Sequence, residues 1–334
     1  MRMGDAGAAV RLATLMIALM AAAAPAQTET TAPPERVTFP SADGRTTLVG
    51  YVYTPRNLGN ARADEPGSGR VSSTRNAGNA RADEPGSGRV SGERNAGNAR
   101  VPAVVMMHGR AGAYSSRANG RYDAATLSQR HQMWGRLWAD QGYVAILVDG
   151  FGPRGHPQGF PRFSYKSRPK ELDEVTVRPL DAYGALAYLR TRPDVAPDRI
   201  ALQGWSNGGS AALATMAPDA PGRAANMPGF RAALVFYPGC RLKHRFGRGF
   251  TPYAPVRVFH GSADEEVSPA RCKRLVDRSR ARGGDIEFTL YPGAVHGFDA
   301  PGARRQSEAA NASAKADATA QAERFFAAQL RSPQ

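Results

Sequence analysis

From residue 101 onward the sequence alternates between short, continuous apolar runs and helix-like stretches. The apolar runs lack the polar alternation of a strand with one wet face, so each is expected to be a strand buried on both faces of a parallel sheet. Helices between parallel strands imply right-handed crossovers, and two earlier strand-like segments suit a hairpin at one edge. The sequence thus predicts an α/β fold with a doubly wound, mostly parallel sheet of about eight strands and helices on both faces. The predicted strands are 37–42, 46–55, 101–107, 142–148, 199–205, 231–237, 255–260 and 286–291, and the predicted helices are 124–141, 181–193, 207–217, 268–282 and 303–330.

Residues 1–26 have the pattern of a secretory signal peptide. Arg2 and Arg11 precede an apolar run at 12–24, and the small residues Ala24-Pro25-Ala26 suit a signal peptidase. We therefore expect cleavage after Ala26 and export to a periplasm or to the outside. The run is short for a bilayer span, which needs about 20 residues, so we expect no stable span after cleavage, with an uncleaved anchor as the alternative.

Residues 56–100 form a low-complexity insertion built on a 19-residue tandem repeat, RNAGNARADEPGSGRVSGE in its second copy. Repeats that stack into a solenoid share a periodic apolar face, and this unit has none. We expect a disordered insertion that interrupts a single domain at 27–334, and a ligand-binding array is the alternative. Without the leader and the insertion, roughly 260 residues remain, which suits one large α/β domain.

A serine lies in a tight turn where the predicted strand 199–205 meets a helix. The segment Gly204-Trp205-Ser206-Asn207-Gly208 has the G-x-S-x-G form of a nucleophile elbow, in which the serine hydroxyl projects from the sheet. The alternative is a glycine-rich turn whose serine only caps the helix. In this context the pattern favours Ser206 as a nucleophile.

A serine nucleophile needs a histidine base and an orienting carboxylate, and both follow later strands. Asp264 comes just after strand 255–260, and His296 comes just after strand 286–291, in the order Ser, acid, His. Rival carboxylates stand nearby, but each is less well placed, and Asp264 has a helix-capping role as its alternative. The rivals are Glu265, Glu266 and Asp299.

An oxyanion site needs two backbone N–H donors. One is expected from Asn207, directly after the nucleophile. The other is expected from Arg110 in the loop His108-Gly109-Arg110, where glycine lets the chain approach the substrate. His108 is interpreted as a residue that shapes this loop.

Taken together, these residues resemble the dienelactone hydrolase family of α/β-hydrolases over nearly all of 101–300. The resemblance implies an α/β-hydrolase fold, a triad of Ser206, Asp264 and His296, and neither a metal nor an organic cofactor. Members that cleave dienelactone use a cysteine nucleophile, whereas the elbow here holds a serine, so the chain resembles exported esterase-like members more than those that cleave dienelactone. Further segments that carry the resemblance are 149–155, Arg178, Asp181, 236–240, 260–264 and 291–298.

The chain carries a net charge of +15, and nearly all of its basic residues are arginine. No nucleic-acid reading module is recognisable, so a nucleic-acid partner is not expected. Basic clusters at 154–170 and 241–248 follow strands and should emerge on the same edge of the sheet as the elbow. We expect them to favour an anionic substrate, with Arg154 pairing a carboxylate in a bidentate manner, and a solvated basic rim is the alternative.

The chain contains two cysteines, Cys240 and Cys272. Only one intrachain disulfide is possible, and export would permit it to form. Because the sequence does not fix the separation of the two residues, the disulfide and two free thiols both stay open.

The sequence therefore predicts a serine hydrolase that acts on a small-molecule ester or lactone through an acyl-enzyme. A peptidase of the prolyl-oligopeptidase type is one alternative, although the chain lacks room for a propeller domain. A non-catalytic binding protein on a hydrolase scaffold is another, although binding alone would not require Ser206, Asp264 and His296 in that order.

Overall fold

The structure is a computed structural model, and it describes residues 32–56, 100–224 and 227–331. The predicted leader at 1–26 lies outside the described residues, as does the predicted insertion apart from Arg56 and Arg100. In these described ranges, no helix combines the length and the apolar character needed to cross a bilayer.

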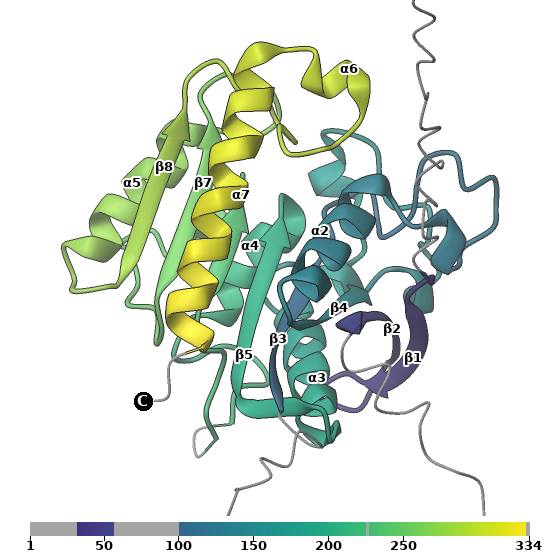
Figure 1. Cartoon of the computed structure of the whole chain (residues 1–334). Helices are drawn as coiled ribbons and strands as arrows, with labels where there is room; N and C mark the ends of the chain where they lie inside the picture. Colours follow the sequence, from purple (N-terminus) through teal and green to yellow (C-terminus); the bar gives the residue numbers. More distant parts are fainter. Residues whose placement is uncertain (1–31, 57–99, 225–226, 332–334) are drawn as a thin grey trace, which may run out of the picture. The chain divides into compact units, whose positions relative to one another are not determined.

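One eight-stranded sheet runs through the described part of the chain in the order β1-β2-β4-β3-β5-β6-β7-β8 (Figure 1). The edge pair β1 and β2 is antiparallel, and β2 also runs antiparallel to β4. All later neighbours are parallel, as the buried apolar runs predicted. The strands are β1 Glu35–Pro40, β2 Thr47–Tyr53, β3 Val101–Met107, β4 Val144–Asp149, β5 Val195–Trp205, β6 Ala233–Phe236, β7 Val256–Gly261 and β8 Ile286–Tyr291.

Helices cover both faces of this sheet (Figure 1). One apolar core joins a sheet face to α3, α4 and α5, and a second core joins the opposite face to α2 and α7. Successive strand residues point to opposite faces, so Val105 enters the first core while Val104 and Met106 enter the second. The helices are α2 Gln129–Asp140, α3 Arg178–Thr191, α4 Asn207–Thr215, α5 Pro269–Arg280, α6 Ala303–Gln306 and α7 Ala309–Leu330.

Two of the predicted helices are each divided in the structure. The stretch 124–141 contains a short 3-10 turn, Ala124–Thr126, and then α2, which begins after Ser128. The Ser128 hydroxyl accepts the backbone N–H of His131, so this serine starts a new helix. The stretch 303–330 is likewise divided into α6 and α7 around Ser307 and Glu308.

A disulfide joins Cys240, in the loop after β6, to Cys272 on α5. The Cα atoms of the two residues lie 5.0 Å apart. Of the two states that the sequence left open, the structure has the oxidised one, and it ties the loop after β6 to the helix that follows β7.

Candidate active site

The turn between β5 and α4 holds Ser206 in an unusual backbone conformation. Its φ and ψ angles are 53° and −115°, a region that non-glycine residues rarely occupy. Such strain is tolerated when the surrounding structure fixes it, and it is typical of a nucleophile elbow. Ser206 is 7% exposed.

Close backbone contacts require the two glycines of the elbow. A Cβ atom on Gly204 would lie 2.2 Å from the carbonyl oxygen of Gly208, and one on Gly208 would lie 2.1 Å from that of Met107. Neither contact could be relieved without moving the backbone. The G-x-S-x-G spacing therefore has a packing cause in this fold.

The structure brings Ser206, His296 and Asp264 together in a chain of hydrogen bonds. Ser206 Oγ lies 3.0 Å from His296 Nε2, and His296 Nδ1 lies 2.8 Å from Asp264 Oδ2. The three residues follow β5, β7 and β8, so the parallel sheet collects them at one edge. With a proton on Nδ1 facing the carboxylate, Nε2 is free to accept the serine proton.

Asp264 is fixed on both carboxylate oxygens. Its Oδ1 accepts the backbone N–H groups of Glu266 and Val267, each at 2.9 Å, while Oδ2 faces His296. Burial raises the pKa of this carboxyl, but the hydrogen bond from His296 and the N–H of Val267 outweigh burial, so the pKa is lowered overall. The group is therefore an anion held in one orientation.

The two predicted oxyanion donors flank the serine. Asn207 is the first residue of α4, so its N–H has no acceptor within the helix. The N–H of Arg110 also has no acceptor in the described ranges of the chain. A Cβ atom on Gly109 would lie 3.2 Å from the carbonyl oxygen of Trp205 and 3.4 Å from Ser206 Cβ, so this loop runs directly beside Ser206.

Arg178 links the loop after β3 to Asn207, a role that sequence reasoning did not assign. Its Nη1 donates to the carbonyl of His108 at 2.8 Å and to Asn207 Oδ1 at 2.7 Å. The side chain is fully buried, and burial lowers its pKa to about 10. His108 shapes the same loop, because its Nε2 accepts the N–H of Gly150 at 3.2 Å. Burial lowers the pKa of His108 well below its usual value, which favours the neutral ring that such an acceptor needs.

A second carboxylate, Glu266, lies on the serine side of the imidazole. Its Oε2 is 3.8 Å from His296 Nε2, and its side chain is 5% exposed. Arg110 Nε and Nη2 donate to its two oxygens at 2.8 and 2.9 Å, and Arg162 Nε lies 2.9 Å from Oε1. Neighbouring Glu265 instead accepts the backbone N–H of His296 at 3.1 Å. The sequence placed Glu266 only as a rival acid two residues after Asp264.

Asp299 anchors the loop that carries the histidine. Its fully buried carboxylate accepts the indole N–H groups of Trp134 and Trp205 at 2.9 Å and the hydroxyl of Tyr237 at 2.5 Å. Arg130 Nε lies 3.1 Å from the same group. Asp299 therefore joins this loop to α2 and to the end of β5. The sequence analysis named Asp299 only as a rival of Asp264 for the orienting acid.

Arg154 is not placed as the sequence predicted. Its guanidinium pairs with the buried carboxylate of Asp181 on α3 at 2.8 and 2.9 Å and donates to the carbonyl of Gly150. A carboxylate that is buried away from water needs such a partner. Arg154 therefore neutralises Asp181, and the prediction that it binds a substrate carboxylate is wrong. Other members of the two basic clusters are also paired, namely Arg162 with Glu265 and Glu266, Lys243 with Asp173, and Arg245 with Asp219.

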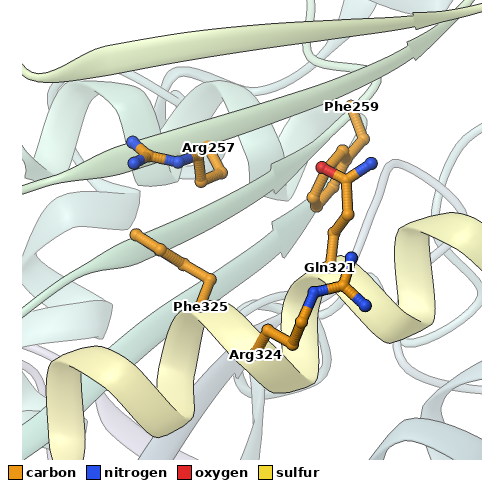
Figure 2. A pocket seen from close by; sticks show the side chains of 5 residues that line it. All are labelled: Arg257, Phe259, Gln321, Arg324 and Phe325. Atoms are coloured by element: carbon orange, nitrogen blue, oxygen red, sulfur yellow. The ribbon is translucent and has the colours of Figure 1, made fainter.

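A separate pocket lies between β7 and α7. Figure 2 shows Arg257 and Phe259 on the strand and Gln321, Arg324 and Phe325 on the helix. These five residues line a cavity of about 310 Å³. None of these residues belongs to the Ser206 site. Arg257 is paired with Asp285 and Glu287, so the charge of this arginine is already neutralised by the protein.

Residues 89–330 match the Dienelactone hydrolase family. The chain belongs to the dienelactone hydrolase family. Family membership and the α/β-hydrolase fold confirm the resemblance that the sequence indicated. That resemblance was based on the Ser206 elbow and on the segments that follow the later strands. This dienelactone hydrolase family member is a hydrolase that acts on ester bonds.

Solved structures share the architecture of this family member. The apo form of Thermogutta terrifontis esterase 2 is 19% identical, with a TM-score of 0.54 over 90% of this chain and 97% of that chain. A dienelactone hydrolase-like promiscuous phosphotriesterase from metagenomic libraries is 18% identical, with a TM-score of 0.55 over 89% and 99%. The T. terrifontis enzyme phosphorylated by paraoxon is 18% identical, with a TM-score of 0.55 over 88% and 94%. At these identities the likeness is one of fold.

Proposed function

We propose that this protein is a serine carboxylic-ester hydrolase that cleaves a small-molecule ester or lactone through an acyl-enzyme on Ser206. The observation that carries the proposal is the continuous hydrogen-bonded chain from Asp264 through His296 to Ser206. A serine hydroxyl becomes a useful nucleophile only when a positioned base takes its proton, and this chain supplies the base and its orienting anion.

In the acylation step, Ser206 Oγ bonds to the carbonyl carbon of the ester while its proton passes to His296 Nε2. The carbonyl oxygen becomes an oxyanion, which the N–H groups of Arg110 and Asn207 are placed to hold. The carbon–oxygen bond to the leaving group then breaks, and His296 returns the proton to the departing alcohol. With a lactone, that alcohol stays attached to the acyl chain.

The decisive experiment removes the nucleophile. Ser206→Ala should abolish ester hydrolysis and labelling by a fluorophosphonate, while the fold measured by circular dichroism stays the same. Ser307→Ala, which removes an exposed hydroxyl between α6 and α7, is the matched control and should keep both signals. Unchanged turnover by Ser206→Ala would refute the assignment, and a folded wild type that resists labelling would favour a binding protein.

Organophosphates are a second class of probe for the same serine. The similar esterase from T. terrifontis is phosphorylated by paraoxon, and a serine with an adjacent base is the group that such reagents modify. Paraoxon should inactivate the wild type with one diethylphosphoryl group per chain, located on Ser206 by peptide mass analysis.

We also propose a preference for esters that carry an anionic group, resting on Arg168 in place of Arg154. The Arg168 guanidinium stacks 4.4 Å from the Tyr165 ring, its Nε donates to Ser164 Oγ, and its two Nη atoms are buried without a hydrogen-bond partner in the described residues. Matched neutral and carboxylate esters should differ in kcat/KM at low salt, and Arg168→Gln should remove the difference. Equal values for wild type and variant would end this proposal.

Export remains part of the proposal. The leader pattern at 1–26 and the disulfide between Cys240 and Cys272 both suit an oxidising compartment. Protein recovered from a periplasmic or culture fraction should begin at Gln27, as read by intact mass. A full-length chain in the membrane fraction would instead indicate an uncleaved anchor.

A further inference from the structure

The Ser206 site contains a carboxylate for which acylation has no use. Glu266 is not the orienting acid, because Asp264 holds His296 Nδ1 on the far side of the ring. Glu266 Oε2 instead lies near Nε2, the nitrogen that faces the serine, at 3.8 Å. During acylation that nitrogen is occupied by the Ser206 hydroxyl at 3.0 Å.

The carboxylate is held rigidly at this place. Arg110 binds it in a bidentate manner and Arg162 binds its Oε1 from the more exposed side. Burial raises the pKa of Glu266, but the hydrogen bond from Arg110 and the charges of His296, Arg110 and Arg162 outweigh burial, and the pKa is lowered. Pairing with two arginines in this way fixes both the position and the charge of the group.

The distance suits a shared water better than a direct contact. A direct N–H···O bond would need about 3 Å, so 3.8 Å is too long for one, and it approaches the separation of about 4 Å at which two groups can share one water. Once Ser206 is acylated, its oxygen has no proton to share with Nε2. A water in that place has two O–H bonds, one for Nε2 and one for Glu266 Oε2, and its lone pair is left to face the acyl carbon.

We propose that Glu266 orients the hydrolytic water that releases the acyl group from Ser206. This inference rests on the proposed function. The water oxygen bonds to the acyl carbon, its first proton passes to His296 Nε2, and the carbon–Oγ bond breaks as that proton is delivered to Ser206. The carboxylic acid leaves, and Glu266 neither gains nor loses a proton. Glu266 thus acts on the second half of the cycle.

The test separates the two half-reactions in the full-length protein with p-nitrophenyl acetate. Glu266→Gln keeps the size of the side chain and removes its charge. We expect it to slow deacylation by about tenfold more than acylation, because misplacing a reacting group by about 1 Å can cost about 100-fold in rate. Stopped-flow traces should then show a burst of nitrophenol that approaches one per chain, and quenched samples should carry an acetyl group on Ser206.

Glu265→Gln is the matched control, because it removes the same charge one residue away, on a side chain that contacts the backbone N–H of His296 and not Nε2. It should leave the ratio of the two rates as in the wild type. Equal slowing of both steps by Glu266→Gln, no change in either, or the same burst in Glu265→Gln would overturn the inference.

Two further measurements can also contradict the proposal. If Glu266→Gln does not fold, Arg162→Gln loosens the same carboxylate from an exposed side chain and should shift the ratio in the same direction by a smaller factor. An unshifted ratio there would count against Glu266. Loss of the proposed function has a different signature, because then no acetyl group forms on Ser206 in the wild type and Ser206→Ala retains turnover.

Discussion

Two aspartates beside the histidine loop have the same side chain and similar burial but different surroundings. Asp264, after β7, faces a titratable imidazole through one oxygen and two backbone N–H groups through the other. Asp299, on the histidine loop itself, faces two indoles, a phenol and an arginine. Only the first is hydrogen-bonded to His296. The difference shows that the hydrogen-bond donors around a buried carboxylate, more than its burial, decide its role. The carboxylate either orients a catalytic group or stabilises the fold.

The largest effect is expected from the substitution Asp264→Asn. The asparagine can still accept the N–H groups of Glu266 and Val267, but its amide would donate to His296 Nδ1 and favour the tautomer with a proton on Nε2. That tautomer cannot accept the serine proton, so kcat should fall by about 10⁴ while the fold persists. Steady-state kinetics with p-nitrophenyl esters, alongside circular dichroism, measures this. A kcat within tenfold of the wild type would show that Asp264 is not the orienting acid.

The opposite result is expected from Asp299→Asn. Here the change leaves Arg130 beside a neutral group and weakens a network that ties the histidine loop to α2 and β5. Breaking such a buried pair should lower the free energy of unfolding by about 3 kcal/mol, measured by urea denaturation. The folded fraction should keep a larger share of kcat than Asp264→Asn does. If Asp299→Asn were as stable as the wild type and had a kcat as low as that of Asp264→Asn, the two aspartates would not differ in role.

The smallest expected effect is a difference in acid sensitivity. Folding lowers the pKa of Asp264 and of Glu266, so both carboxylates stabilise the fold above their unfolded pKa values of about 4, and this stabilisation is lost as pH falls through the lower folded values. The stability advantage of the wild type over Asp264→Asn should therefore shrink between about pH 6 and about pH 3. Urea unfolding of both proteins across this range measures it, and a constant or growing advantage would contradict the sign.

Much of the scaffold was predictable because its signals are local. Continuous apolar runs mark strands that are buried on both faces, and the glycines around Ser206 mark a turn where a Cβ would strike neighbouring backbone. The carboxyl ends of parallel strands then meet at one edge, which is why candidates named from separate segments came together. The split of 124–141 was missed because Ser128 starts a helix inside an unbroken helical pattern.

The pairing of charged side chains was less predictable. Arg154 was expected to bind a substrate carboxylate, but it is paired with Asp181. Glu266 was considered only as a rival of Asp264, but it lies beside His296 Nε2. Both outcomes depend on which groups lie within about 3 to 4 Å of each other once the chain is folded. The sequence offers several carboxylates as possible partners for each arginine, and it does not show which of them the arginine contacts.

The sequence by itself determined the order of strands and helices, the elbow at Ser206, and the order in which acid and histidine follow it, because these depend on local periodicity and on chain direction. Tertiary structure alone decided which carboxylate faces which nitrogen of His296, that Arg154 pairs with Asp181, and that Cys240 meets Cys272. Hydrogen bonds and ion pairs act only over short distances, and those distances are set by the packing of the whole sheet and its helices.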